Sequence, residues 1–132
     1  MDHEILVKEF RKIAAHLKKS VGGVELVVLT APEENARRDW TLVVSARGYD
    51  SWTRFEALQD LAKTLRARLS EEVWRAAHGV DVLKTDDPFV QTFKRRYYYL
   101  KTGAEVPPTT IAGTEIGKAV IIEIGAKTKK AA

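Results

Sequence analysis

Apolar positions near the start of the chain recur at the spacing of an amphipathic helix. They are four, three and four positions apart, with basic residues around the rest of the helix, and comprise Leu6, Phe10, Ile13 and Leu17. Asp2 can cap the start of this helix, and Gly22-Gly23 can end it.

Two apolar runs follow the first helix. Residues 24–31 (VELVVLTA) and 40–46 (WTLVVSA) are rich in β-branched side chains and flank the polar loop 32–39. Both runs predict strands. Because apolar residues are nearly continuous in them, at least one strand should be central and covered on both faces.

The next signals predict two helices and a third strand. Thr53 and Glu56 have the spacing of a capping box, Trp52 stands at the position of a hydrophobic staple, and leucines at helical spacing follow up to residue 69. Ser70 begins a second, short helix that Gly79 should end, and residues 80–83 (VDVL) read as a strand.

Residues 93–101, FKRRYYYLK, combine four cations with three tyrosines. Asp87-Pro88 is a helix start, so we expect a helix over residues 88–102 that ends at Gly103. Its predicted buried face comprises Phe89, Val90, Phe93, Tyr97 and Leu100. Its wholly or partly exposed residues should include Lys94, Arg95, Tyr98 and Tyr99.

Residues 117–126 read as the last strand, with the short run TTI before it as a partner across a turn. The predicted order is α-β-β-α-α-β-α-β. This order indicates one α/β domain, with α+β as the alternative, in which helices pack on a mixed sheet of about four strands. The domain should span residues 1–126 and be followed by a basic, disordered tail at 127–132.

Composition narrows the function classes without choosing among them. The 132 residues include no cysteine, which removes disulfides and cysteine-based zinc sites. His3, His16 and His78 lack metal-ligand spacing. Residues 1–20 have no continuous apolar stretch of the kind found in signal peptides, so we expect a cytoplasmic protein.

The net charge of +4 is concentrated in one segment. Residues 88–104 contain four basic residues and no acidic ones. Cations can neutralise phosphates while exposed tyrosines stack on bases, which predicts weak binding of single-stranded nucleic acid. The residues concerned are Lys94, Arg95, Arg96, Tyr98, Tyr99 and Lys101, which Arg37, Arg38, Arg54, Arg66 and Arg68 could extend. Two alternatives to nucleic-acid binding stay open for these residues: a solvated helix face, and an interface with another protein or a second copy of the chain.

The order of elements also resembles the minimal nucleotidyltransferase domain. Asp39-Trp40-Thr41 stands where that family has an acid-x-acid pair at the start of its second strand, and Asp81 stands at the place of its third acid. In the family these carboxylates hold two Mg²⁺ ions that align a nucleoside triphosphate for transfer. The resemblance covers roughly residues 3–100 and implies a similar fold.

This chain departs from the family pattern at two places. Thr41 replaces the second acid, and Thr30-Ala31-Pro32 replaces the Gly-Ser whose backbone approaches the phosphates. A hydroxyl cannot supply the charge of a bridging carboxylate. We therefore expect a non-catalytic binding or regulatory module, with Mg²⁺ bound only if Asp39 and Asp81 lie close together.

Overall fold

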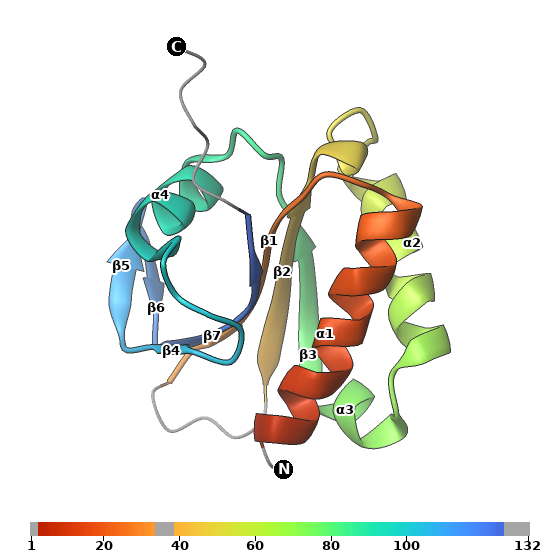
Figure 1. Cartoon of the computed structure of the whole chain (residues 1–132), viewed down its shortest axis with the longest axis horizontal. Coiled ribbons are helices and arrows are strands. Elements are labelled where there is room, and N and C mark those ends of the chain that lie inside the picture. Colours follow the sequence, from red (N-terminus) through yellow and green to blue (C-terminus); the bar gives the residue numbers. More distant parts are fainter. Residues whose placement is uncertain (1–2, 34–38, 126–132) are drawn as a thin grey trace.

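A mixed five-stranded sheet forms the centre of the structure (Figure 1). The structure is a computed structural model that describes residues 3–33 and 39–125. The elements are α1 His3–Ser20, β1 Val24–Ala31, β2 Trp40–Ala46, the 3-10 turn η1 Arg47–Tyr49, α2 Arg54–Arg68, α3 Glu71–Ala76, β3 Ala77–Val82, α4 Pro88–Tyr97, β4 Glu105–Val106, β5 Thr109–Ile111, β6 Thr114–Ile116 and β7 Lys118–Ile124.

The strand order in the sheet is β3-β2-β1-β7-β4. β1 is antiparallel to both of its neighbours, β3 is parallel to β2, and β4 is antiparallel to β7. β5 and β6 form a separate two-stranded hairpin. The α/β class and the order of the helices and long strands are confirmed, and so is the prediction that at least one of the first two strands is central, since β1 and β2 both lie inside the sheet.

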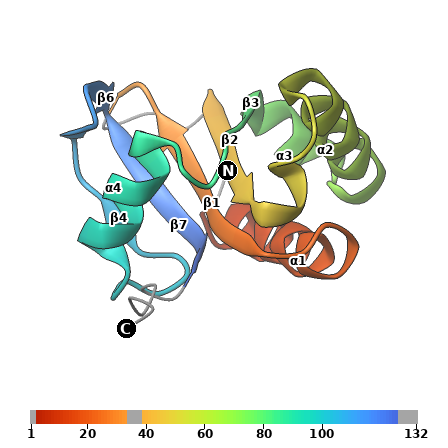
Figure 2. The same ribbon diagram turned by 90° about the horizontal axis from the view of Figure 1, so that it is seen from above.

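Helices α1, α2 and α3 cover one face of the sheet, while α4 and the β5–β6 hairpin lie against the other (Figure 2). Alternate residues of β1 enter the two cores, since Val27 faces α1 and α2 and Val28 faces α4. The first core includes Phe10 and Leu61, and the second is centred on Phe93. This two-sided burial explains why the sequence of β1 is almost continuously apolar.

The predicted helix starts are present as hydrogen bonds. Thr53 and Glu56 form a complete capping box at the start of α2. The Ser70 hydroxyl accepts from the Val73 amide, and the Asp87 carboxylate accepts from the Phe89 amide one residue after Pro88. Each signal is contained within four consecutive residues, so it can be recognised from the sequence without knowledge of the fold.

Two predicted helix ends were wrong. The helix expected to reach residue 102 ends at Tyr97, because the chain after it is held to β7: Thr102 Oγ1 donates to the Ile122 carbonyl and the Gly103 amide to the Ile121 carbonyl. The helix expected to stop at Gly79 ends at Ala76, and β3 begins at Ala77.

Gly79 lies inside β3 because the strand passes close to β2. A Cβ atom at this position would lie 2.9 Å from Thr41 Oγ1. The glycine therefore permits strand pairing at a position where the sequence predicts a helix stop.

The short strands also differ from expectation. The run TTI is β5, but its partner is β6 rather than the last strand. Strand β4 was not predicted, since two residues give no periodicity to recognise. Asp2 and the predicted tail at 127–132 lie outside the described residues. No helix in the described part of the chain is long and apolar enough to cross a membrane.

Candidate functional site

A cleft of about 650 Å³ opens where the α4 layer leaves part of the sheet uncovered. Its floor is formed by side chains of neighbouring strands, because Thr41 is paired with Gly79 and Val43 with Asp81 in the register of β2 and β3. Residues paired across adjacent strands project from the same face of a sheet. Thr41, Val43 and Asp81 are therefore presented together to the cleft.

The opposite wall of the cleft comes from the second layer. Phe89 of α4 and Glu115 and Ile116 of β6 line it, so the cleft lies between strands β1, β2 and β3 and elements that follow these strands in sequence. The lining combines a phenylalanine and aliphatic side chains with carboxylates and threonine hydroxyls. Such a mixture is typical of pockets that bind a partly apolar small molecule through a few polar contacts.

Asp81 is held in position by an ion pair. The Arg54 guanidinium lies 2.6 Å from Asp81 Oδ1, and Arg54 is the first residue of α2, directly after the capping threonine. Both side chains retain contact with solvent, so the pair contributes at most about 1 kcal/mol to stability. Its main effect is to offset the charge of the carboxylate and to orient it.

Asp39 lies at the other end of the cleft in the left-handed backbone region, with φ of 66°. Aspartate tolerates this conformation better than most residues. Its Oδ1 is 3.4 Å from His78 Nε2, and both side chains are exposed. Asp39 and His78 thus form a weak polar pair at the mouth of the cleft.

The structure places Asp39 and Asp81 in one cleft, at positions that are separated along the paired strands β2 and β3. Asp81 is paired with Val43 of β2. Trp40, the residue after Asp39, lies three residues before Val43 on the same strand. Three residues of a strand span about 10 Å. This backbone separation is larger than the distance of about 3.5–4 Å between the Mg²⁺ ions of a two-metal site. Within residues 3–33 and 39–125, no group of three or more histidine and acidic side chains could hold a metal ion.

The segment Thr30-Ala31-Pro32 uses its backbone within the fold. The Gly117 amide donates to the Ala31 carbonyl, and a Cβ at Gly117 would lie 2.3 Å from the Pro32 carbonyl oxygen. The backbone that would approach phosphates in the nucleotidyltransferase family is here packed against the turn between β6 and β7.

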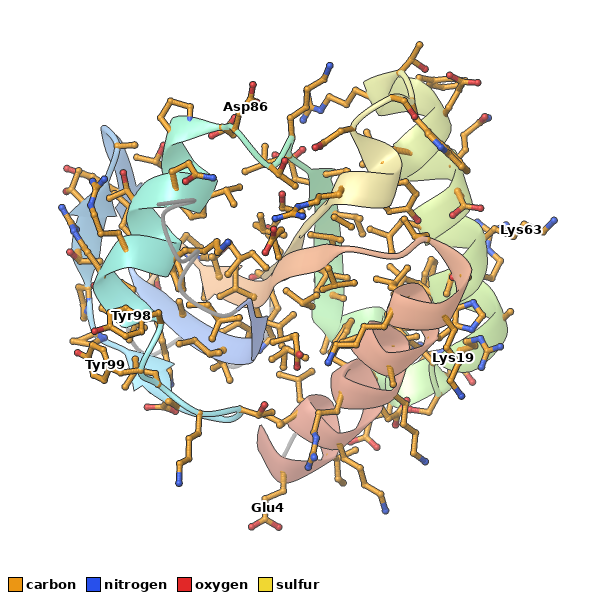
Figure 3. The ribbon with its side chains drawn as sticks, turned by 45° about the horizontal axis from the view of Figure 1, so that its top comes forward. Glu4, Lys19, Lys63, Asp86, Tyr98 and Tyr99 are labelled. Carbon is orange, nitrogen blue, oxygen red and sulfur yellow. The ribbon has the colours of Figure 1, made fainter. Side chains whose placement is uncertain are left out.

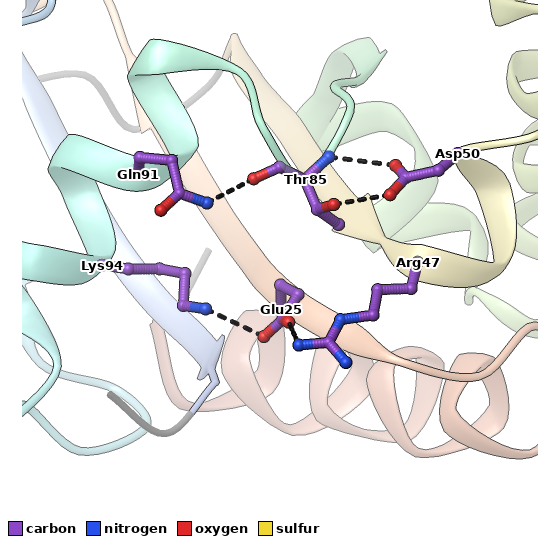
Figure 4. A network of polar contacts seen from close by, with 6 residues as sticks. All are labelled: Glu25, Arg47, Asp50, Thr85, Gln91 and Lys94. Carbon is purple, nitrogen blue, oxygen red and sulfur yellow. Dashed lines mark hydrogen bonds and ion pairs between the residues drawn. The ribbon is translucent and has the colours of Figure 1, made fainter. Parts of the chain in front are cut away.

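The prediction that Lys94 is exposed was wrong. Its side chain is only 7% exposed, and its Nζ lies 2.9 Å from Glu25 Oε2 (Figure 4). The other oxygen of Glu25 pairs with Arg47 at 2.9 Å. Lys94 therefore joins α4 to β1 as part of a polar cluster under the helix, and it is withdrawn from the surface proposed to bind nucleic acid.

The rest of the basic-aromatic segment, residues 94–101, is on the surface. Arg95, Arg96 and Lys101 are exposed, as are Tyr98 and Tyr99. Arg96 donates to the Thr110 carbonyl at 2.9 Å, which fixes its guanidinium beside the hairpin. Tyr98 and Tyr99 make an edge-to-face contact with ring centroids 5.8 Å apart, and Figure 3 shows both rings at the periphery of the molecule.

The predicted extension of this surface by arginines of α2 is not formed. Arg54, Arg66 and Arg68 belong to a helix on the opposite face of the sheet from α4 (Figure 2). Arg66 instead lies over the Trp74 ring at 5.7 Å, and Arg54 pairs with Asp81. Arg37 and Arg38 lie outside the described residues.

Sequence reasoning missed three residues that line the cleft: His78, Phe89 and Glu115. Phe89 was assigned to the core, and it does pack there while one side of it faces the cleft. Glu115 had no local signal, because its position depends on how the hairpin folds over the sheet. The sequence singles out His78 only as a possible zinc ligand, and no group of three or more histidine and acidic side chains in the described part of the chain could hold a metal ion.

No protein-family model matches this chain, and no curated protein or solved structure is significantly similar to it. What the cleft and the basic-aromatic segment can bind is therefore inferred from their own chemistry.

Proposed function

We propose that this chain is a non-catalytic binding module with a nucleotidyltransferase-like layout, and that its ligand occupies the cleft between the sheet and α4. The observation that supports this most strongly is that Asp39, Thr41 and Asp81 all line one cleft. These are the positions that the resemblance assigns to the nucleotide site.

The arrangement of charges argues against nucleotidyl transfer. In-line transfer assisted by two metal ions needs carboxylates on both sides of the metals. Here a threonine occupies one position, Arg54 already neutralises Asp81, and Asp39 lies farther along the strand. Binding can persist on this surface without the metal-dependent step.

The lining favours a nucleoside over a nucleoside triphosphate. Asp81 and Glu115 can accept hydrogen bonds from hydroxyl or amino groups, Thr41 can donate or accept, and Phe89 offers an apolar surface to a ring. A polyphosphate without bound metal would be repelled by Asp39, Asp87 and Glu115, the other carboxylates that line the cleft. The proposed ligand is therefore a nucleoside or a similarly small, polar ring compound.

Isothermal titration calorimetry with the four ribonucleosides, and with ATP with and without Mg²⁺, tests this proposal. We expect at least one nucleoside to bind independently of Mg²⁺, and both Thr41→Val and Asp81→Asn to weaken it about tenfold or more, equivalent to about 1.4 kcal/mol. Glu71→Gln, which removes an exposed carboxylate on α3 away from the cleft, is the matched control and should bind normally.

Two results would overturn the proposal. If none of the nucleosides binds, the cleft is not a nucleoside site. If ATP binds tightly only with Mg²⁺ and Asp39→Ala abolishes that binding, the site is metal-dependent and the non-catalytic interpretation is wrong.

A second function, weak binding of single-stranded nucleic acid, is favoured by a separate observation. Tyr98 and Tyr99 are 43% and 66% exposed beside three exposed cations at the end of α4. Aromatic rings next to cations can stack on bases without sequence preference. With Lys94 removed from the set, the proposed contacts are Arg95, Arg96, Tyr98, Tyr99 and Lys101.

Fluorescence anisotropy with a labelled oligothymidylate at about 50 and 200 mM salt tests this function. Binding should fall with salt, and Arg95→Ala with Arg96→Ala should weaken it further. Tyr99→Ala should cost about 1–3 kcal/mol, the usual contribution of one stacked base. Absence of binding at the lower salt concentration would reject this second function.

A further inference from the structure

A second basic surface lies on the side of α1 that faces away from the core. Lys8, Arg11 and Lys12 are all exposed there. Lys8 is three positions before Arg11 and four before Lys12, so the three side chains lie on one side of the helix. Within the described ranges none of the three makes an ion pair. Their charge is therefore available to a ligand.

These cations border a shallow groove of about 560 Å³. Val7 and Ala15 supply its apolar floor, Glu4 lies at one end, and Gly103 forms the facing wall. The groove combines an apolar floor with a basic rim, which suits a polyanion that also carries apolar surface.

The facing wall belongs to the chain that follows the basic-aromatic segment. Gly103 has φ of 90°, and its amide donates to the Ile121 carbonyl at 2.7 Å, which fixes the turn to β7. A Cβ at Gly103 would lie 3.9 Å from Val7 Cγ1, so the turn lies directly beside α1. The exposed Lys101 lies between Tyr99 and Gly103 in sequence, two residues from each.

We propose that the α1 groove binds the phosphodiester backbone of a single-stranded nucleic acid whose bases stack on Tyr98 and Tyr99. This inference rests on the second proposed function and assigns it a second set of contacts. Lys8, Arg11 and Lys12 neutralise phosphates, and Lys101 carries the positive surface across to the tyrosines. A flexible single strand can follow this bent path from helix to turn and offer unpaired bases to the rings, whereas a duplex keeps its bases stacked inside.

The test compares three variants by fluorescence anisotropy, using a fluorescein-labelled oligothymidylate of about 12 nucleotides. The groove variant combines Lys8→Gln, Arg11→Gln and Lys12→Gln, and the tyrosine variant combines Tyr98→Ala and Tyr99→Ala. The control combines Lys63→Gln, Arg66→Gln and Arg68→Gln, which removes the same charge from exposed positions of α2. Lys63 lies on the side of the molecule away from the two tyrosines (Figure 3).

We expect the groove variant to lower affinity about tenfold or more and to reduce the slope of log K against log salt by about 2, since each phosphate contact to a single strand contributes about 0.7. The control variant should lose clearly less affinity. If the wild type binds, the tyrosine variant loses binding, and the groove variant matches the control, then the groove inference is wrong and the second function stands. If the wild type does not bind at low salt, both fail.

Discussion

Lys94 belongs to a basic segment that the sequence predicts to be exposed, yet its side chain is buried. Lys94 lies beside the apolar face of α4. Its buried ammonium group is paired with the carboxylate of Glu25, which belongs to a strand about seventy positions earlier. Gly125 makes room for that carboxylate, since a Cβ there would lie 2.4 Å from Glu25 Oε2. Nothing in the local sequence around Lys94 indicates this partner.

The Lys94–Glu25 pair should contribute measurably to stability. Lys94→Met removes one partner of a buried ion pair and should lower the free energy of unfolding by about 2–3 kcal/mol. The loss should stay below the roughly 3–5 kcal/mol of a fully isolated charge, because Arg47 remains beside Glu25. Urea unfolding measures it, and the double variant with Glu25→Gln should lose less than the sum of the single variants.

Ser45→Ala is a suitable control for this prediction. Ser45 and Lys94 are the buried polar side chains within the described residues, and the Ser45 hydroxyl has no hydrogen-bond partner there. Removing an unpaired hydroxyl should change stability by less than about 0.5 kcal/mol or increase it. If Lys94→Met is as mild as Ser45→Ala, the ion pair does not stabilise the fold.

At the level of elements, the sequence predicted the starts of α2, α3 and α4 and the end of α1 just before Gly22-Gly23, but not the ends of α3 and α4. The starts at Thr53, Ser70 and Asp87 are encoded by a side chain that caps the amides of the next residues. The end at Tyr97 depends on hydrogen bonds from the following turn to β7, and the end at Ala76 depends on pairing with β2. Both ends are decided by partners distant in sequence.

The capping box of α2 gives a prediction with a pH dependence. Thr53→Ala should lower the free energy of unfolding by about 1 kcal/mol near pH 7, because it removes the acceptor for the Glu56 amide. Hydrogen bonds from Thr53 lower the pKa of Glu56 below its ordinary value. The stability linked to this shift is present above the pKa of the unfolded state and is lost as the pH falls through the lower, folded pKa.

Urea unfolding at about pH 7 and about pH 3 measures both effects. Wild type should lose stability relative to Glu56→Gln on acidification, since glutamine does not titrate. Thr64→Ala in the same helix is the control for Thr53→Ala, because its hydroxyl donates within the helix and caps nothing. Equal losses from the two threonine variants would contradict the capping role.

For the whole molecule, the sequence predicted the α/β class and that at least one of the first two strands is central, but not the cleft. The class follows from periodicities that each segment carries alone. The cleft exists because α4 and the β5–β6 hairpin cover only part of one sheet face, and Glu115 reaches it from the hairpin. The α1 groove was missed for the same reason, since Gly103 meets Val7 only in the folded chain.

The two sides of the sheet should differ in their resistance to opening. Among the described residues, 21 buried side chains form the core on the side of α1, α2 and α3, whereas 11 form the core under α4 and the hairpin. Less buried apolar area means a smaller free energy for opening that layer. We expect native-state hydrogen exchange to report a lower opening free energy for residues 109–116 than for β1, whose amides should exchange only by global unfolding.

Mass-spectrometric exchange at increasing urea concentrations separates the two processes, because local opening depends less on urea than global unfolding does. Peptides covering α4 and β5–β6 should exchange first. Lys94→Met should speed up exchange in α4 in particular, because it removes the ion pair between α4 and β1. The amides in peptides from β1 and β2 should exchange at the rate set by global unfolding. If β5–β6 shows the same opening free energy and urea dependence as β1, the molecule opens as a single cooperative unit, and the smaller layer has no separate stability.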